Sequence, residues 1–298
     1  MNVRREFLLF IAFAWPALGA DDGIDIIGND GAAIMAKVVA NVEKATDSRR
    51  QFLYHQAVIT NLVRPNGQIS RKENRQYEVF PTEKATEKKL VSMRGEARKG
   101  KTVTPYGEDG FPKKHLDIDG DLMRDLTNDL VDEKKSRDGI PPSLFPLRAK
   151  DLDGYRFTLK EEFEYQGRRT YKIAFEPSGK HTCVNIGGDD DECEGASWKG
   201  EAWIDVEELQ PARIFTEQAF RVPWGVKVFL GTNIQRSGFT VSYQRVAENI
   251  WFPASYGTEF RFNALWGYRR TVTLSLESSG FQKTDIASQI KYEGPKEP

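Results

Sequence analysis

The stretch GYRFTLKEEFEYQGRRTYKIAFEP, residues 154–177, alternates apolar and polar side chains on both sides of a Gln166-Gly167 turn. Its apolar positions are Tyr155, Phe157, Leu159, Phe163 and Tyr165 before the turn, and Tyr171, Ile173 and Phe175 after it. A period of two is typical of a strand with one buried face and one solvated face. The stretch therefore predicts two antiparallel strands joined by a tight turn, with these apolar side chains on one face.

Similar segments recur along most of the chain. Further strands are predicted at 52–62, 69–80, 88–94, 202–206, 213–220, 226–230, 238–246, 256–262 and 268–276. Asn66-Gly67 between the first two is a strong hairpin signal. Because strands do not alternate with helices, the pattern predicts a mainly β (α+β) fold. We expect a curved antiparallel sheet or incomplete β-barrel of about 10–11 strands.

Two amphipathic helices are predicted to cover the concave face of this sheet. In the first, over 30–45, Ile34, Val38 and Val42 form one apolar stripe. Leu122, Leu126 and Leu130 mark the second, which is expected to end near Lys135. Residues 95–120, rich in Gly, Pro and Lys, are predicted to be a loop. Within it, DIDGD at 117–121 indicates a solvated turn, because its glycine is misplaced for a calcium-binding loop.

The N-terminus has the pattern of a secretory signal peptide. Arg4 and Arg5 precede an apolar run over 7–18, and small residues follow at 17–20. The run is shorter than the roughly 20 residues of a membrane span. We therefore predict export with cleavage near Ala20, so that 1–20 is removed and 21–298 forms a single β domain, a size that one all-β domain can reach.

Cys183 and Cys193, the two cysteines of the chain, flank a short acidic stretch. In an exported protein the pair predicts a disulfide across a hairpin loop, which on chain entropy contributes about 2–3 kcal/mol. A zinc site requires four ligands, and His181 with the two cysteines supplies three at most. Calcium at Asp189–Glu192 remains an alternative, although the alternating ligands of a calcium loop are absent.

Charge and motifs argue against nucleic-acid binding and catalysis. Loss of Arg4, Arg5 and Glu6 with the signal changes 43 basic and 44 acidic residues to 41 and 43. A nearly neutral chain does not favour nucleic acid as a partner. The sequence contains no G-x-S-x-G, G-x-x-x-x-G-K-[ST] or H-E-x-x-H motif. We expect no enzymatic activity, no cofactor and no metal, with a hydrolase as the least favoured alternative.

The apolar face of so many strands is larger than two short helices can cover. An uncovered apolar face is an aggregation hazard, so the sheet must curl, pair or hold something. A curved sheet that is partly covered leaves an apolar cavity or groove for a greasy ligand. A filled core without a ligand is equally compatible with this composition.

The stretch 154–177, followed by GEAWIDVEELQPARI at 200–214, resembles the LolA/LolB-like superfamily of periplasmic lipoprotein carriers. The shared features are the paired strands, the Gly-Arg turn and a Trp-Ile-Asp strand that ends in a proline turn. The resemblance extends over about 30–283 and includes outer-membrane lipoprotein-sorting proteins and RseB-type regulators. It implies an incomplete barrel with a lipid-sized cavity, a periplasmic location and no chemistry. The cysteine loop, the 95–120 segment and the extra length depart from the compact carriers.

By this resemblance, the expected function is to carry a lipid or the acyl chains of lipoproteins. The cavity is expected to be lined by apolar residues of the strands, with the first helix as a movable lid; these residues are Phe157, Leu159, Phe163, Ile173, Ile204, Val241 and Phe260, and Ile34, Val38 and Val42. The alternative is a sensor or interaction module that binds a protein partner. For it, a basic loop would meet an acidic partner or lipid head groups, through Arg94, Arg98, Lys99, Lys101, Lys113 and Lys114.

Overall fold

The computed structural model describes residues 30–82, 86–111, 117–131, 137–141, 144–179, 198–218, 232–264 and 267–284. Cys183 and Cys193, the strand predicted at 226–230 and the predicted N-terminal signal peptide lie outside these residues.

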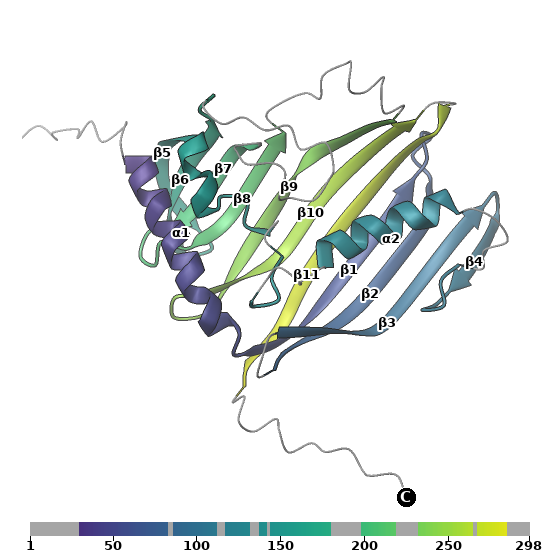
Figure 1. The fold of residues 1–298 in the computed structure, drawn as a ribbon, viewed down its shortest axis with the longest axis horizontal. Coiled ribbons are helices and arrows are strands. Elements are labelled where there is room, and N and C mark those ends of the chain that lie inside the picture. Colours follow the sequence, from purple (N-terminus) through teal and green to yellow (C-terminus); the bar gives the residue numbers. More distant parts are fainter. Residues whose placement is uncertain are drawn as a thin grey trace, which may run out of the picture.

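In the described part of the chain, eleven antiparallel strands form one sheet in the order β4-β3-β2-β1-β11-β10-β9-β8-β7-β6-β5 (Figure 1). The strands are β1 (Phe52–Val63), β2 (Ile69–Pro81), β3 (Thr86–Lys99), β4 (Thr102–Tyr106), β5 (Tyr155–Tyr165), β6 (Arg168–Pro177), β7 (Trp198–Asp205), β8 (Pro211–Gln218), β9 (Thr232–Ala247), β10 (Ile250–Ala264) and β11 (Arg269–Lys283). Chain neighbours pair throughout, so β1–β4 and β5–β11 are two meanders. They join where β1 pairs with β11, and the sheet remains open at β4 and β5. The predicted mainly β fold with 10–11 antiparallel strands is confirmed.

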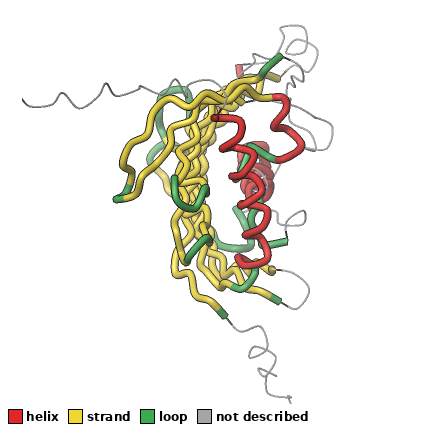
Figure 2. The backbone as a smooth tube through the Cα atoms, turned by 90° about the vertical axis from the view of Figure 1, so that its left-hand side faces the viewer, coloured by secondary structure: helices red, strands yellow, loops and turns green. Residues whose placement is uncertain are grey.

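The helices lie on one side of the curved sheet (Figure 2). We call this side the inner face and the opposite side the outer face. The helices are α1 (Asp30–Arg49), α2 (Ile118–Val131) and the 3₁₀ helix η2 (Ala149–Gly154). No helix in the described part of the chain is both long and apolar enough to cross a membrane.

Helix α1 packs across the β5 end of the sheet. Met35, Val38 and Val39 are buried along its length, and this stripe reflects the periodicity of its sequence. At its start, Gly31 lies over the backbone of Phe157, where an added Cβ would come within 3.1 Å. At its end, buried Arg49 donates to Asp138 at 2.6 Å. The helix is therefore held at both ends.

The described part of the segment before η2, residues 137–141 and 144–148, packs on the inner face beside α1. Leu144 and Leu147 are buried, and the hydroxyl of Tyr243 on β9 donates to the carbonyl of Leu144. Asp138 also accepts from the backbone N–H of Ile140. Because these contacts anchor it to both α1 and the sheet, this segment is part of the core.

Residues 95–120 differ from the predicted loop. Strand β3 continues to Lys99, β4 follows after the turn at Gly100, and α2 begins at Ile118. Gly100 adopts a φ of 61°, a left-handed conformation that glycine tolerates and that suits a tight hairpin. Gly, Pro and Lys are depleted in strands, and this composition masked a hairpin at the sheet edge, where such residues are common.

Candidate functional site

The inner face of the sheet, between α1 and α2, is the candidate site. Nine of the ten predicted cavity residues contribute to its apolar half. Five are buried in one core cluster, namely Val38, Phe157, Ile173, Ile204 and Val241. Four are partly buried against that cluster, namely Ile34, Val42, Leu159 and Phe260.

Phe163 lies on the outer face, and its predicted place beside Leu159 is wrong. The β5–β6 register shifts between Leu159 and Glu161. This β-bulge inserts one residue, so the side chains that follow change face. The ring of Phe163 meets Trp203 edge-on at 5.1 Å, and Lys172 lies over the Phe163 ring. The face of Phe163 was therefore predicted wrongly because the alternation of apolar and polar residues does not reveal the bulge.

Several apolar side chains of the inner face are only half covered. They come from both helices and from strands at both ends of the site, and are Ile34, Leu122, Leu126, Leu159, Tyr171, Trp198 and Phe260. Wholly buried residues such as Ile173 and Val241 make core contacts in this conformation. A ligand that left the helices in place would therefore meet the half-covered group first.

The other half of the inner face, under α2, carries buried charged side chains among apolar ones, and we call it the polar half. Arg71, Glu73 and Arg75 alternate along β2, and all three are buried. Their register partners on β1 are Leu62, Thr60 and Val58. Because i and i+2 residues of a strand share a face, three charged side chains of β2 lie side by side beneath the helix.

These charges are paired within the fold. Arg71 donates to both carboxylate oxygens of Asp117, at 2.8 and 3.1 Å. Arg75 donates to Glu73 at 2.9 Å and to the amide oxygen of Asn128 at 3.0 Å. Asp117 precedes α2 and Asn128 lies within it, so the arginines of β2 hold both ends of the helix. The predicted solvated turn at 117–121 is wrong, since Asp117 is an ion-pair partner whose side chain is 14% exposed.

Asp119 connects the start of α2 to β11. Its carboxylate accepts from the hydroxyl of Tyr268 at 2.7 Å and from Nε of Arg270 at 3.2 Å. Burial raises the pKa of Tyr268, and the negative charge of Asp119 raises it further. The phenol therefore remains a hydrogen-bond donor at neutral pH.

Tyr106 completes the polar half from β4. Its hydroxyl donates to Glu73 at 2.8 Å, and its pKa is raised by burial and then by the Glu73 charge. Burial lowers the pKa of Arg71, but the hydrogen bond to Asp117 and the nearby negative charges together outweigh it and leave that pKa above its ordinary value. The phenol thus stays protonated and the guanidinium stays charged.

The ring of Tyr106 reaches Glu73 because Gly95, its register partner, has no side chain. A Cβ at Gly95 would stand 2.2 Å from ring carbons of Tyr106. The sequence predictions missed this polar half of the site. Its signal was the charged residues at alternate positions of the strand predicted at 69–80, a pattern that normally indicates a solvated face.

Comparison with protein-family models and with curated proteins gives no match. Among solved structures, the chain is similar to a DUF1329 family protein from Desulfovibrio piger, with 12% identity, a TM-score of 0.32, and coverage of 85% of this chain and 93% of that one. It is similar to an outer-membrane lipoprotein-sorting domain from Vibrio parahaemolyticus, with 9% identity, a TM-score of 0.32, and coverage of 83% and 92%. It is also similar to a LolA superfamily protein from Nitrosomonas europaea, with 10% identity, a TM-score of 0.30, and coverage of 85% and 96%.

Proposed function

We propose that the protein is an exported, non-catalytic carrier that binds a lipid, or the acyl chains of a lipoprotein, on the inner face of its sheet. The observation that carries this proposal is the half-covered apolar group between α1 and α2. Apolar surface left open to water favours a hydrocarbon occupant. The buried charges of the polar half under α2 would limit how far an acyl chain extends along the inner face.

The free energy of such binding is large enough to matter. Burial of an acyl chain contributes about 0.8 kcal/mol per CH₂, so a groove that covers only half of a sixteen-carbon chain gains about 6 kcal/mol. That corresponds to a dissociation constant of about 10 to 100 μM. Movement of α1, which would expose buried Val38, is the proposed means to tighten or release the cargo.

Phe260 and Phe215 make a matched pair for a test. Phe260 packs against the core on the inner face, whereas Phe215 is 41% exposed and points outward, because its neighbour Ile214 is fully buried. We expect Phe260→Ala to weaken uptake of a fluorescent fatty acid by about tenfold, and Phe215→Ala to leave it unchanged. The measurement is fluorescence titration of the purified protein.

Lipid extraction followed by mass spectrometry provides the independent measurement. A carrier purified from its native compartment should bring lipid or lipoproteins with it. Absence of co-purified lipid together with no fatty-acid uptake would reject the proposal. A single protein captured in stoichiometric amount without lipid would favour the alternative, a sensor or interaction module.

A further inference from the structure

A cluster of cations lies at one corner of the sheet, on the β1–β2 and β3–β4 hairpins. The segments 62–72 and 95–105 contain six Arg and Lys residues and one Glu, in a chain with a formal net charge of −1. One of the six, Arg71, is neutralised by Asp117. We call the other charged residues the basic corner: Arg64, Lys72, Glu96, Arg98, Lys99 and Lys101.

Much of the basic corner lies on the outer face. Arg71 points to the inner face, where it meets Asp117, so the next residue, Lys72, points outward. Glu96 is the register partner of Lys72 and shares its face. Arg98, two residues further, pairs with Val103 on the same side. Lys72 and Arg98 are thus directed away from α2 and from the candidate acyl site.

Two hairpins hold the corner in one shape. Nη2 of Arg64 donates to the carbonyl of Arg98 at 2.9 Å, which ties the β1–β2 turn to β3. The first turn closes with the N–H of Gln68 bound to Asn66 Oδ1 at 3.1 Å. Gly67 adopts a left-handed φ of 80° there. Because both turns are tight, the cations do not depend on a long loop for their arrangement.

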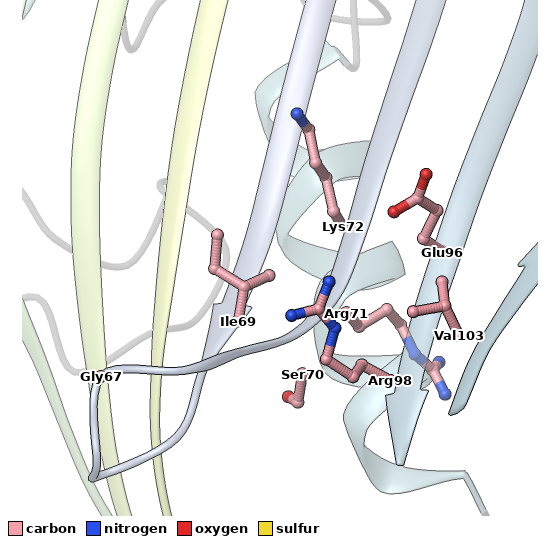
Figure 3. Close-up of a pocket in the computed structure, with 8 residues that line it drawn as sticks. All are labelled: Gly67, Ile69, Ser70, Arg71, Lys72, Glu96, Arg98 and Val103. Atoms are coloured by element: carbon pink, nitrogen blue, oxygen red, sulfur yellow. The ribbon is translucent and has the colours of Figure 1, made fainter. Parts of the chain in front are cut away.

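The corner also has a concave centre and an apolar component. A pocket of about 380 Å³ is lined by Gly67, Ile69, Ser70, Arg71, Lys72, Glu96, Arg98 and Val103 (Figure 3). Ile69 and Val103 are 45% and 43% exposed, although both belong to strands. Lys72, Arg98 and Lys101 are exposed as well. Aliphatic side chains therefore lie among cations on one surface.

We propose that the basic corner docks the protein on an anionic phospholipid bilayer. Lys72 and Arg98 would meet phosphate groups at the pocket, while Ile69 and Val103 would contact the acyl boundary. Basic residues near an anionic membrane each contribute attraction, and exposed aliphatic groups add to it. Protein interfaces, in contrast, are depleted in Lys and concentrate Tyr and Trp at their centres. The described corner has lysines and no Tyr or Trp among its charged and pocket residues, so it fits a membrane better than an acidic protein.

Vesicle co-sedimentation with the full chain tests the proposal. At low salt, the protein should bind phosphatidylglycerol vesicles and not phosphatidylcholine vesicles. The triple variant Arg98→Ala/Lys99→Ala/Lys101→Ala removes three cations, each worth about fivefold in affinity. We expect a loss of about a hundredfold for the triple variant. Raising the ionic strength toward 1 M, where the screening length falls to about 3 Å, should release the native protein.

A matched control removes three exposed lysines elsewhere, with Lys37→Ala/Lys44→Ala/Lys160→Ala. This control loses the same three positive charges from other surfaces. Its affinity for anionic vesicles should therefore fall by no more than about threefold, through the change in net charge alone. An equal loss in both variants, or no binding of the native protein to anionic vesicles, would overturn the proposal. So would capture of an acidic protein through the corner without vesicle binding.

The docking proposal and the acyl-binding proposal fail separately. The triple variant should take up fluorescent fatty acid as the native protein does, because its changes lie at the β3–β4 hairpin and none of them is in the half-covered apolar group. Phe260→Ala should sediment with vesicles normally. If the native protein took up no fatty acid, the carrier function would be rejected. The proposal that the basic corner binds membranes would not be affected.

Discussion

The buried charges of β2 show what single residues contribute at this site. Removing an ion pair from water costs several kcal/mol per ion, and the attraction between the partners does little more than offset it. The Arg71–Asp117 and Arg75–Glu73 pairs are therefore weak as sources of stability. Instead, the pairs fix the positions of the groups that they join, since each buried charge is neutralised only beside its partner. Helix α2 is consequently fixed over β2 rather than free to slide.

Asp205 at the end of β7 gives a prediction for acid stability. Its carboxylate is 1% exposed and accepts from Arg168 and from the backbone N–H of Glu208 at 2.8 Å. Burial raises the pKa of Asp205, but these partners lower it more, so that it lies below its ordinary value. A depressed folded-state pKa adds stability above the unfolded pKa of about 3.9, which is lost as pH falls through the folded value.

Asp205→Asn should therefore lower the free energy of unfolding by about 2 kcal/mol at pH 6. The difference from the native protein should shrink as pH falls below about 4 and through the lowered folded-state pKa. Urea unfolding at several pH values measures it. Glu162→Gln, which breaks an exposed pair with Arg169, is the control and should have a small effect at every pH. A constant difference for Asp205→Asn from pH 6 to pH 2 would contradict the linkage.

The strands and helices could largely be predicted, because their periodicity reflects one buried face. Helix α1, the hairpin of β5 and β6, and the later strands follow from alternating or four-residue spacing. The errors fall where another rule overrides alternation. The bulge after Leu159 changes the face of Phe163, and the β3–β4 hairpin has the composition of a loop. The polar half of the site was missed because burial of Arg71 and Glu73 depends on partners from α2 and β4, which lie far away in sequence.

The bulge in β5 leads to a prediction about its two ends. Leu159 precedes it and packs toward the core, whereas Phe163 follows it and packs on Trp203. Leu159→Ala should weaken fatty-acid uptake by about fivefold, because it removes apolar contact from the inner face. Phe163→Ala should leave uptake unchanged while it lowers the free energy of unfolding by about 1 kcal/mol through loss of the aromatic contact. If Phe163→Ala weakened uptake as much as Leu159→Ala, the assigned faces would be wrong.

Across the whole molecule, the two meanders depend on a single seam. Strands β1 and β11 pair through eleven residue pairs, and α2 adds a second connection by binding Arg75 of β2 and Arg270 of β11. Hydrogen bonds and helix contacts thus cross the boundary between β1 and β11, where neighbouring strands of the sheet are not consecutive in sequence. A single cooperative unit is therefore expected, which is also what the predicted single domain over 21–298 requires.

Val58 lies in the middle of this seam, fully buried and paired with Leu276. We expect Val58→Ala to lower the free energy of unfolding by about 2 kcal/mol through the cavity it leaves. Because the sheet unfolds as one unit, hydrogen exchange under mild denaturant should report the same loss in the amides of β2 and in those of β6, although β6 is remote from the substitution. Phe215→Ala, at a partly exposed position, serves as the control and should change neither set by more than about 0.5 kcal/mol. Destabilisation of β2 with unchanged exchange in β6 would show that the seam separates two units, and the chain would then be two domains that share a sheet.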